Sequence, residues 1–225
     1  MIDTQVKMIK EIAIKIKHYC PNAIVLVVSN PLDVLTYFFQ KESQFSKNKV
    51  IGIASSLDSS RFRYILSEKF NLKQSQISDA IVLGEHGDSM VPIFSQTKID
   101  GKISTDLLDS EQKEIISREI RDYWKHLRNY KSRSQFGIAK NTFDVIQSIY
   151  KNQKLIVPAS ILLEGEYGET DVSMGVPVII TNNGVSKIEE IELNQSEIDA
   201  LKKSAQIIRN YVNSVQFNIT KECNP

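Results

Sequence analysis

The sequence predicts an α/β fold in which a partial doubly wound parallel sheet is followed by a region of α+β structure. Two apolar runs, AIVLVV at 23–28 and VIGIA at 50–54, lack polar alternation, which is typical of strands buried on both faces of a parallel sheet. Each run lies between segments of helical periodicity, and this order predicts right-handed crossovers. Beyond residue 83, short strand candidates and tight turns alternate with longer helices.

The helices before residue 83 follow from spacing and from helix-terminating residues. From Ile2 to Tyr19 apolar residues recur every three or four positions, which predicts an amphipathic helix that ends before Pro21. A second helix is expected from Pro31 and a third over SSLDSSRFRYILSEKF at 55–70. Because a doubly wound sheet normally opens on a strand, we expect this chain to begin inside a domain.

After residue 83 strands are expected in MVPIF, on both sides of the Asp100-Gly101 turn, and in the runs LIVPASILL, DVSMGVPVIIT and SKIEEIEL. Their separation by glycine-containing turns favours antiparallel pairing.

Three helices are expected among these strands. Asp109 with Gln112 forms a capping-box pattern at the start of the first, and the second is expected from about Ser134 to Tyr150. The last helix follows Asn194, with Glu197 in the position that completes a second capping box.

Composition excludes several classes of partner. The charged residues, 24% of the chain, balance to a net charge of +1, so neither nucleic acid nor an anionic membrane is an expected partner. Cys20 and Cys223 have no metal-ligand spacing, and no metal site is expected. No apolar run reaches the roughly 18 residues of a membrane span, so a cytoplasmic protein is expected.

Of the three histidines, His86 has the setting of a functional residue. It lies in GEHGDS directly after the apolar run DAIVLG, and Gly84 and Gly87 would let the backbone turn sharply and bring a ligand close. A turn histidine without chemistry remains the alternative. His18 and His126 lie in charged helical segments and are expected at the surface.

Asp58 and Arg61 are spaced to share one face of the predicted helix at 55–70. Taken alone, this pair would be a surface ion pair of little energetic value. If Asp58 instead faces His86, its carboxylate can orient the ring and favour the imidazolium form, while Arg61 offers a planar fork to a substrate carboxylate.

Asn30 follows the apolar run that ends at Val28, at the carboxyl end of a predicted parallel strand. Ligands of open α/β sheets bind at these strand ends, so Asn30 is a candidate for binding substrate or cofactor. A capping role before Pro31 is the alternative, and spacing alone favours it.

Four segments, VVSNPLDVLTY, NKVIGIASSLDSSRFR, LGEHGDSMVP and GEYGETDVSMGVPVIITNNGV, resemble in order and spacing the lactate/malate dehydrogenase family. The resemblance covers nearly the whole chain. It implies a remnant of a Rossmann-type NAD-binding domain at 1–53 and a catalytic, substrate-binding domain at 54–225.

The resemblance also implies roles for individual residues. His86 would be the proton donor and acceptor, Asp58 its carboxylate partner, and Arg61 the clamp on the substrate carboxylate. Asn30 would contact the reacting oxygen and, with Val28, the NAD cofactor. The family further implies a homodimer or tetramer, and unpaired strand edges would favour association.

The sequence departs from the family pattern at its start. No G-x-G occurs among the nine glycines, and the family's opening strand, glycine-rich turn, ribose-binding acid and mobile loop with a second arginine are not in this sequence. We therefore expect an amino-terminally truncated member, for which a non-catalytic subunit or binding module is a second hypothesis.

Substrate identity rests on weaker similarities. GEHGDS, FGIA and SQTKIDGK resemble the lactate branch, whereas SSRFR and SMVP are also found in the malate branch. Ser134 stands where lactate enzymes usually place a threonine near the substrate methyl group. The sequence favours L-lactate dehydrogenase, which interconverts lactate and pyruvate with NAD, and malate dehydrogenase is the alternative.

Overall fold

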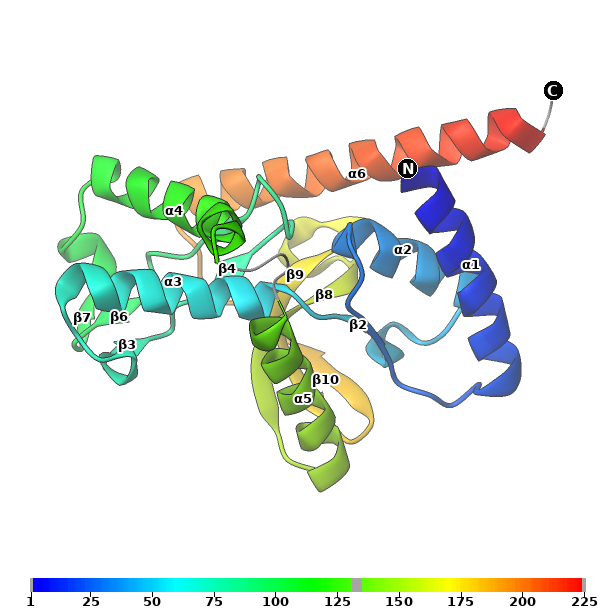
Figure 1. Cartoon of the computed structure of the whole chain (residues 1–225), viewed down its shortest axis with the longest axis horizontal. Helices are drawn as coiled ribbons and strands as arrows, with labels where there is room; N and C mark the ends of the chain where they lie inside the picture. Colours follow the sequence, from blue (N-terminus) through cyan, green and yellow to red (C-terminus); the bar gives the residue numbers. More distant parts are fainter. Residues whose placement is uncertain (1, 131–134, 224–225) are drawn as a thin grey trace.

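The computed structural model describes residues 2–130 and 135–223, which form an α/β fold around one mixed five-stranded sheet (Figure 1). The strand order is β1 (Val25–Val27), β2 (Val50–Gly52), β8 (Leu155–Glu164), β9 (Thr170–Thr181) and β10 (Gly184–Ile188). Strands β1 and β2 are parallel, and the remaining neighbours are antiparallel. The predicted parallel and antiparallel regions thus share one sheet, joined where Gly52 pairs with Ser160.

Helices cover this sheet. They are α1 (Ile2–Tyr19), α2 (Leu32–Ser43), α3 (Ser55–Phe70), α4 (Ser110–Arg128), α5 (Phe136–Lys151) and α6 (Gln195–Cys223). In Figure 1, α6 runs along the top of the molecule from the α4 side to the amino-terminal end of α1, while α5 lies at the bottom beside the edge strand β10. The last helix therefore contacts both the amino-terminal helices and strand β9.

Shorter elements fill the region between α3 and α4. Two small sheets form there, one from β3 (Ile77–Ser78), β6 (Lys98–Ile99) and β7 (Lys102–Ile103), the other from β4 (Val82–Leu83) and β5 (Val91–Pro92). Single turns of 3-10 helix are η1 (Lys47–Lys49), η2 (Gln74–Gln76), η3 (Ser104–Asp106) and η4 (Glu166–Gly168). Strand β4 matters most for function, because the segment containing His86 follows it.

The predicted elements are largely confirmed, with two differences. Helix α2 begins at Leu32 rather than at Pro31, because Pro31 is the N-cap residue and has an extended backbone. The run SKIEEIEL stays in a strand only as far as Ile188. Beyond it the Glu189 amide still donates to the Pro177 carbonyl of β9 at 2.8 Å, and the Tyr167 hydroxyl then donates to the Glu189 carbonyl and accepts from the Ile191 amide.

Both predicted capping boxes are present. Asp109 accepts from the Gln112 amide at 2.8 Å, and the Gln112 side chain accepts from the Asp109 amide at 3.0 Å. Asn194 and Glu197 make the same reciprocal pair at 2.9 and 3.1 Å. Each box satisfies amide groups that the first turn of a helix leaves without a backbone partner.

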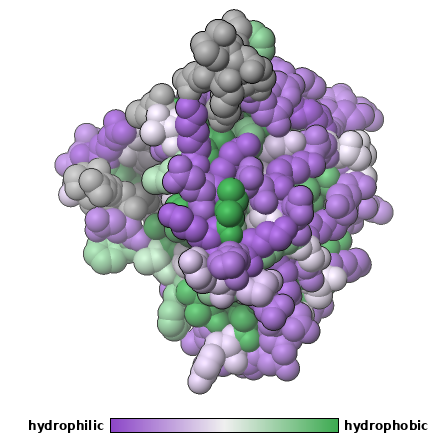
Figure 2. Space-filling model, turned by 90° about the vertical axis from the view of Figure 1, so that its right-hand side faces the viewer, coloured by the Kyte–Doolittle hydropathy of each residue, from purple (hydrophilic) through white to green (hydrophobic). Residues whose placement is uncertain are grey.

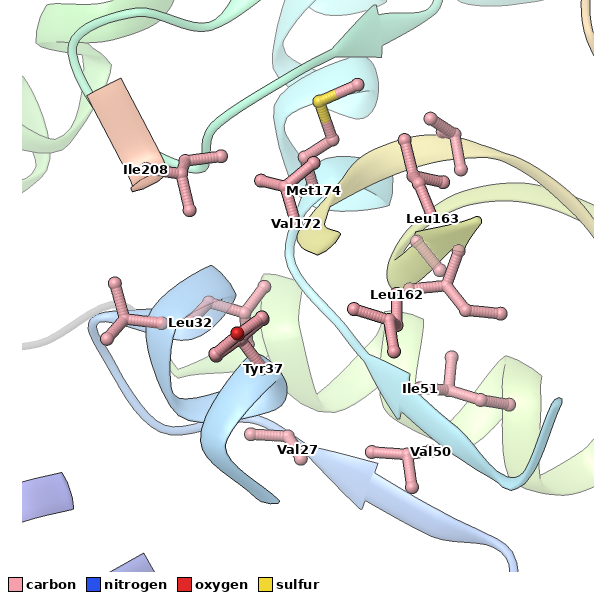
Figure 3. Packing of buried hydrophobic residues seen from close by; sticks show 14 of the residues in the cluster. Val27, Leu32, Tyr37, Val50, Ile51, Leu162, Leu163, Val172, Met174 and Ile208 are labelled. Carbon is pink, nitrogen blue, oxygen red and sulfur yellow. The ribbon is translucent and has the colours of Figure 1, made fainter. Parts of the chain in front are cut away.

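The main hydrophobic core lies between the sheet and helices α2 and α6 (Figure 3). Figure 3 shows Leu32 and Tyr37 of α2 and Ile208 of α6 packed near Val172 and Met174 of β9. A second cluster packs α3 against α4 and the small sheets, through Phe62, Leu66, Ile77, Ile99, Ile116 and Ile120. The two clusters hold the ends of α3 and β4 in fixed positions.

Helix α1 forms the outer face opposite α3. Its inward side buries Val6 and Ala13, while Met8, Ile12, Ile14 and Tyr19 are exposed. Viewed from the α1 side, the surface is mainly hydrophilic with small hydrophobic areas between the polar groups (Figure 2). Within the described ranges, no helix is both long and apolar enough to cross a membrane.

Candidate active site

The segment that carries His86 leaves strand β4 through a glycine that the geometry requires. Gly84 has a φ of +82° and exchanges two backbone hydrogen bonds with Gly175 of β9, at 2.9 and 2.8 Å. A Cβ atom on Gly84 would lie 2.6 Å from the Ser204 hydroxyl oxygen. The expected sharp turn is therefore present at Gly84, whereas Gly87 does not adopt a positive φ.

His86, Asp58 and Arg61 meet in one cluster. His86 Nδ1 lies 2.6 Å from Asp58 Oδ2, and Arg61 Nη1 donates to Asp58 Oδ1 at 2.9 Å. The side chain of Asp58 is 1% exposed, that of Arg61 9% and that of His86 17%. The hypothesis that Asp58 and Arg61 form an isolated surface ion pair is therefore wrong, because the Asp58 carboxylate is buried and contacts both Arg61 and His86.

This arrangement changes the proton affinity of His86. Burial has the largest single effect and would lower the pKa of His86, but the charge and hydrogen bond of Asp58 and the charge of Asp33 together raise the pKa above its usual value. The Asp33 carboxylate acts in the same direction and Arg61 in the opposite one. With Nδ1–H donated to Asp58, Nε2 remains the ring nitrogen that can exchange a proton with a ligand.

Arg61 retains donors for an anion. One of its five N–H groups binds Asp58, and its Nε has no hydrogen-bond partner among the residues that the structure describes. The guanidinium lies 5.5 Å from the centre of the Tyr123 ring of α4, which orients its plane. A fork held in this way suits a carboxylate ligand.

A cavity of about 510 Å³ opens beside this cluster. Four of the residues singled out in the sequence, Val28, Asn30, Arg61 and His86, line it, and Asp58 lies behind His86. Asn30 does not cap helix α2, since the N-cap residue is Pro31 and no side chain caps the helix. Ser134, the expected neighbour of the substrate methyl group, lies outside the described residues.

Sequence reasoning missed the residues that helix α4 contributes to this cavity. Arg121, Trp124 and Arg128 line it, and the Arg128 guanidinium lies 4.3 Å from the centre of the Trp124 ring. Their spacing of three and four residues could have indicated a common helix face, beside the face that buries Ile116 and Ile120. The cavity thus has cations on α3 and on α4.

Asp33 and Ser160 were also missed. Asp33 Oδ2 accepts a hydrogen bond from the backbone amide of His86 at 2.7 Å, and Oδ1 accepts from the Ser160 hydroxyl at 2.6 Å. In the sequence, Asp33 has the appearance of a first-turn helix charge, so no local signal links it to a histidine 53 residues away. The remaining histidines, His18 and His126, are exposed as predicted.

The cavity fits the nicotinamide end of NAD. Apolar side chains of Val28, Ile53, Leu57 and Ile138 offer surface for a flat ring, and Asn30 lies at a strand end where amide hydrogen bonds can be made. Among the described residues, no cluster of three or more histidine, cysteine or acidic side chains could hold a metal ion.

Two family descriptions match the sequence. Residues 1–52 match "lactate/malate dehydrogenase, NAD binding domain", and residues 55–218 match "lactate/malate dehydrogenase, alpha/beta C-terminal domain". The chain belongs to the lactate/malate dehydrogenase family. Members of this family are NAD-dependent oxidoreductases with a Rossmann-type sheet, which is the fold and the class of enzyme that the sequence predicted.

Individual relatives bear both names of the family. The chain is 38% identical to the malate dehydrogenase of Chlorobium limicola over 211 residues, 93% of this chain and 68% of that protein. It is 34% identical to L-lactate dehydrogenase 2 of Clostridium acetobutylicum over 224 residues, 97% of this chain and 70% of that protein.

Solved structures give the same result. The malate dehydrogenase of Aeropyrum pernix superposes with a TM-score of 0.89 at 29% identity, covering 95% of this chain and 72% of that one. The lactate dehydrogenase of Cryptosporidium parvum, complexed with lactic acid and nicotinamide adenine dinucleotide, superposes with a TM-score of 0.87 at 34% identity, covering 95% and 69%.

Proposed function

We propose that this chain carries the proton-transfer and substrate-binding machinery of an NAD-dependent L-2-hydroxyacid dehydrogenase, with malate and oxaloacetate as the preferred substrate pair. The observation that carries the proposal is the contact of His86 Nδ1 with Asp58 Oδ2 at 2.6 Å, with Arg61 on the second oxygen of the same carboxylate. This cluster supplies a proton, its orientation and an anion anchor together.

The proposed step balances in both directions. A nicotinamide cofactor bound beside Val28 and Asn30 would supply the hydride for the carbonyl carbon of a 2-oxo acid, and in its oxidised form would take up the hydride from a 2-hydroxy acid. His86 gives its Nε2 proton to the carbonyl oxygen, so a 2-hydroxy acid forms and the ring becomes neutral. Asp58 stabilises the imidazolium before transfer, and Arg61 holds the substrate carboxylate. Asn30 is proposed to bind the reacting oxygen, and Val28 the cofactor.

The malate assignment rests on two supports. Most of the relatives that match the chain well are named malate dehydrogenase, including that of Chlorobium limicola. Oxaloacetate also carries a second carboxylate, and Arg121 and Arg128 add positive charge to the cavity that already holds Arg61. The preference for lactate that the sequence suggested is therefore the weaker of the two assignments.

Lactate and pyruvate remain the second candidate pair, because the Cryptosporidium parvum lactate dehydrogenase matches the fold closely and its structure contains lactic acid. We also place the boundary between the NAD-binding part of the chain and the catalytic domain at residues 53 and 54. The ends of the two family matches, at 52 and 55, support that boundary.

The test follows NADH absorbance with the purified chain and oxaloacetate or pyruvate, beside a His86→Ala variant. Turnover that prefers oxaloacetate and is lost in the variant supports the proposal, and a preference for pyruvate supports the lactate alternative. A folded chain without turnover on either acid contradicts a catalytic function and favours a non-catalytic binding module.

A further inference from the structure

A second buried carboxylate, that of Asp33, contacts the His86 segment, and it comes from α2 rather than from α3, which carries Asp58. Asp33, in the first turn of α2, is 3% exposed. Its Oδ2 accepts from the His86 amide at 2.7 Å, while Asp58 approaches the ring from α3. The catalytic histidine thus lies between two aspartates that come from different helices.

The contact with the His86 backbone fixes the residue in a way that the ring contact cannot. A hydrogen bond to Nδ1 constrains the direction of the imidazole, but it leaves the peptide free to shift. Asp33 holds that peptide, and the Ser160 hydroxyl holds Asp33 through its other oxygen at 2.6 Å. Strand β8 and helix α2 therefore position the backbone that carries the ring.

We propose that Asp33 is a positioning residue of the dehydrogenase, which anchors the His86 peptide and adds a second negative charge that favours the protonated ring. The effects of Asp33 on turnover rest on the proposed function, whereas its effect on the pKa of His86 does not. Asp33 is not among the residues that line the cavity beside His86 Nε2, so we assign its effect to its contact with the His86 peptide.

The surrounding charges agree with this role. Burial raises the pKa of Asp33 to about 6, and the hydrogen bonds from Ser160 and the His86 amide oppose that rise, so the group is ionised at neutral pH. The ionised form contributes to the raised pKa of His86, after Asp58. The charged or titratable groups facing this pair are Asp58 and Arg61 of α3, Glu85 and Asp88 of the same segment, Arg121 and Arg128 of α4, and Tyr211 of α6.

Two substitutions separate the anchor from the charge. In Asp33→Asn the amide oxygen can still accept from the His86 amide and the NH₂ group can donate to the Ser160 oxygen, so the anchor remains and the charge is lost. Asp33→Ala removes both. Asp199→Asn, which removes an exposed aspartate bound to Gln195 on α6, is the matched control for loss of one negative charge.

The first measurement is the ring titration of His86 by NMR in the full chain labelled at histidine. Asp33→Asn is expected to lower the pKa of His86, whereas Asp199→Asn is expected to leave the pKa of His86 unchanged. An unchanged His86 titration in Asp33→Asn overturns the electrostatic part. This readout does not depend on turnover, so a chain without dehydrogenase activity would contradict the proposed function alone.

The second measurement is kcat for 2-oxo acid reduction at a pH where His86 is protonated. There Asp33→Asn should stay near the wild-type value, with the basic limb of its pH profile moved to lower pH. Asp33→Ala should lose roughly tenfold to a hundredfold in kcat, because small displacements of a catalytic group cost that much. Wild-type kcat in a folded Asp33→Ala variant overturns the anchor. If that variant does not fold, Ser160→Ala, which removes the hydroxyl that holds Asp33 Oδ1, tests the anchor instead: its kcat should fall, and a wild-type kcat overturns the anchor.

Discussion

Replacing Asp58 by asparagine is expected to remove most of the catalytic power of the site. The Asp58 carboxylate contacts His86 Nδ1 at 2.6 Å and is 1% exposed, so water does not screen it. Two unit charges about 4 Å apart at an effective dielectric of about 20 interact by ~4 kcal/mol. At about 1.4 kcal/mol per tenfold, and with Arg61 offsetting part of this field, the loss in kcat/KM should be on the order of 10²- to 10³-fold.

The same substitution should also cost stability. In Asp58→Asn the buried Arg61 guanidinium would donate to an uncharged amide oxygen instead of a carboxylate. Because hydrogen bonds to charged groups contribute about 1.5–3 kcal/mol, the free energy of unfolding should fall by part of that amount. Initial rates with oxaloacetate and NADH, together with urea unfolding, measure the two effects. Asp144→Asn on α5 removes an aspartate that pairs with Lys140 near the surface and is the control. A wild-type kcat/KM in Asp58→Asn at every pH would refute the assigned partnership.

Three further outcomes follow from the site. Reduction needs the protonated form of His86, whose pKa is raised, so kcat/KM for the oxo acid should fall as pH rises through that pKa. Over the same range kcat/KM for the hydroxy acid should rise. If the two pH profiles instead change in the same direction, the role assigned to His86 is wrong. Gly84→Ala, with a φ of +82° and a Cβ 2.6 Å from Ser204, should lower the free energy of unfolding by roughly 1–3 kcal/mol in urea titrations. Arg61→Lys should raise KM about tenfold or more, since an ammonium cannot replace a planar fork, and an unchanged KM would exclude Arg61 as the clamp.

The raised pKa of His86 also affects folding, with a defined sign. A histidine whose pKa is higher in the folded state stabilises the fold fully below its unfolded pKa of about 6.5. That contribution is lost as pH rises through the pKa of the folded state. The free energy of unfolding of the wild type should therefore exceed that of His86→Ala by more at acidic pH than at alkaline pH, as urea titrations can measure.

Local structure could be predicted well because its causes are local. Helix α3 has the bounds expected from its sequence, and both capping boxes form, because each depends on side chains within one helical turn. The run at 155–163 was expected as a strand and is one. In contrast, nothing in it indicated that Ser160 would pair with Gly52 and extend the sheet of β1 and β2 by an antiparallel strand.

Only the site residues that stand in short sequence motifs could be predicted, because a motif reflects local spacing. His86, Asp58 and Arg61 stand in short motifs whose residue types suggest proton transfer and anion binding. Asp33 and Ser160 act only through the fold, which brings them to His86 from α2 and β8. A sequence pattern reports spacing along one element, whereas these contacts depend on how separate elements pack.

The anchors of the His86 segment have a consequence for how the protein acquires activity. Asp33 lies 53 residues before His86, and Ser204, which accepts from the Glu85 amide, lies 119 residues after Glu85. Contacts between such distant positions form late, because the intervening chain must first lose its freedom. During refolding, helical signal should therefore return before turnover, and the regained activity would mark the moment at which the last helix has docked.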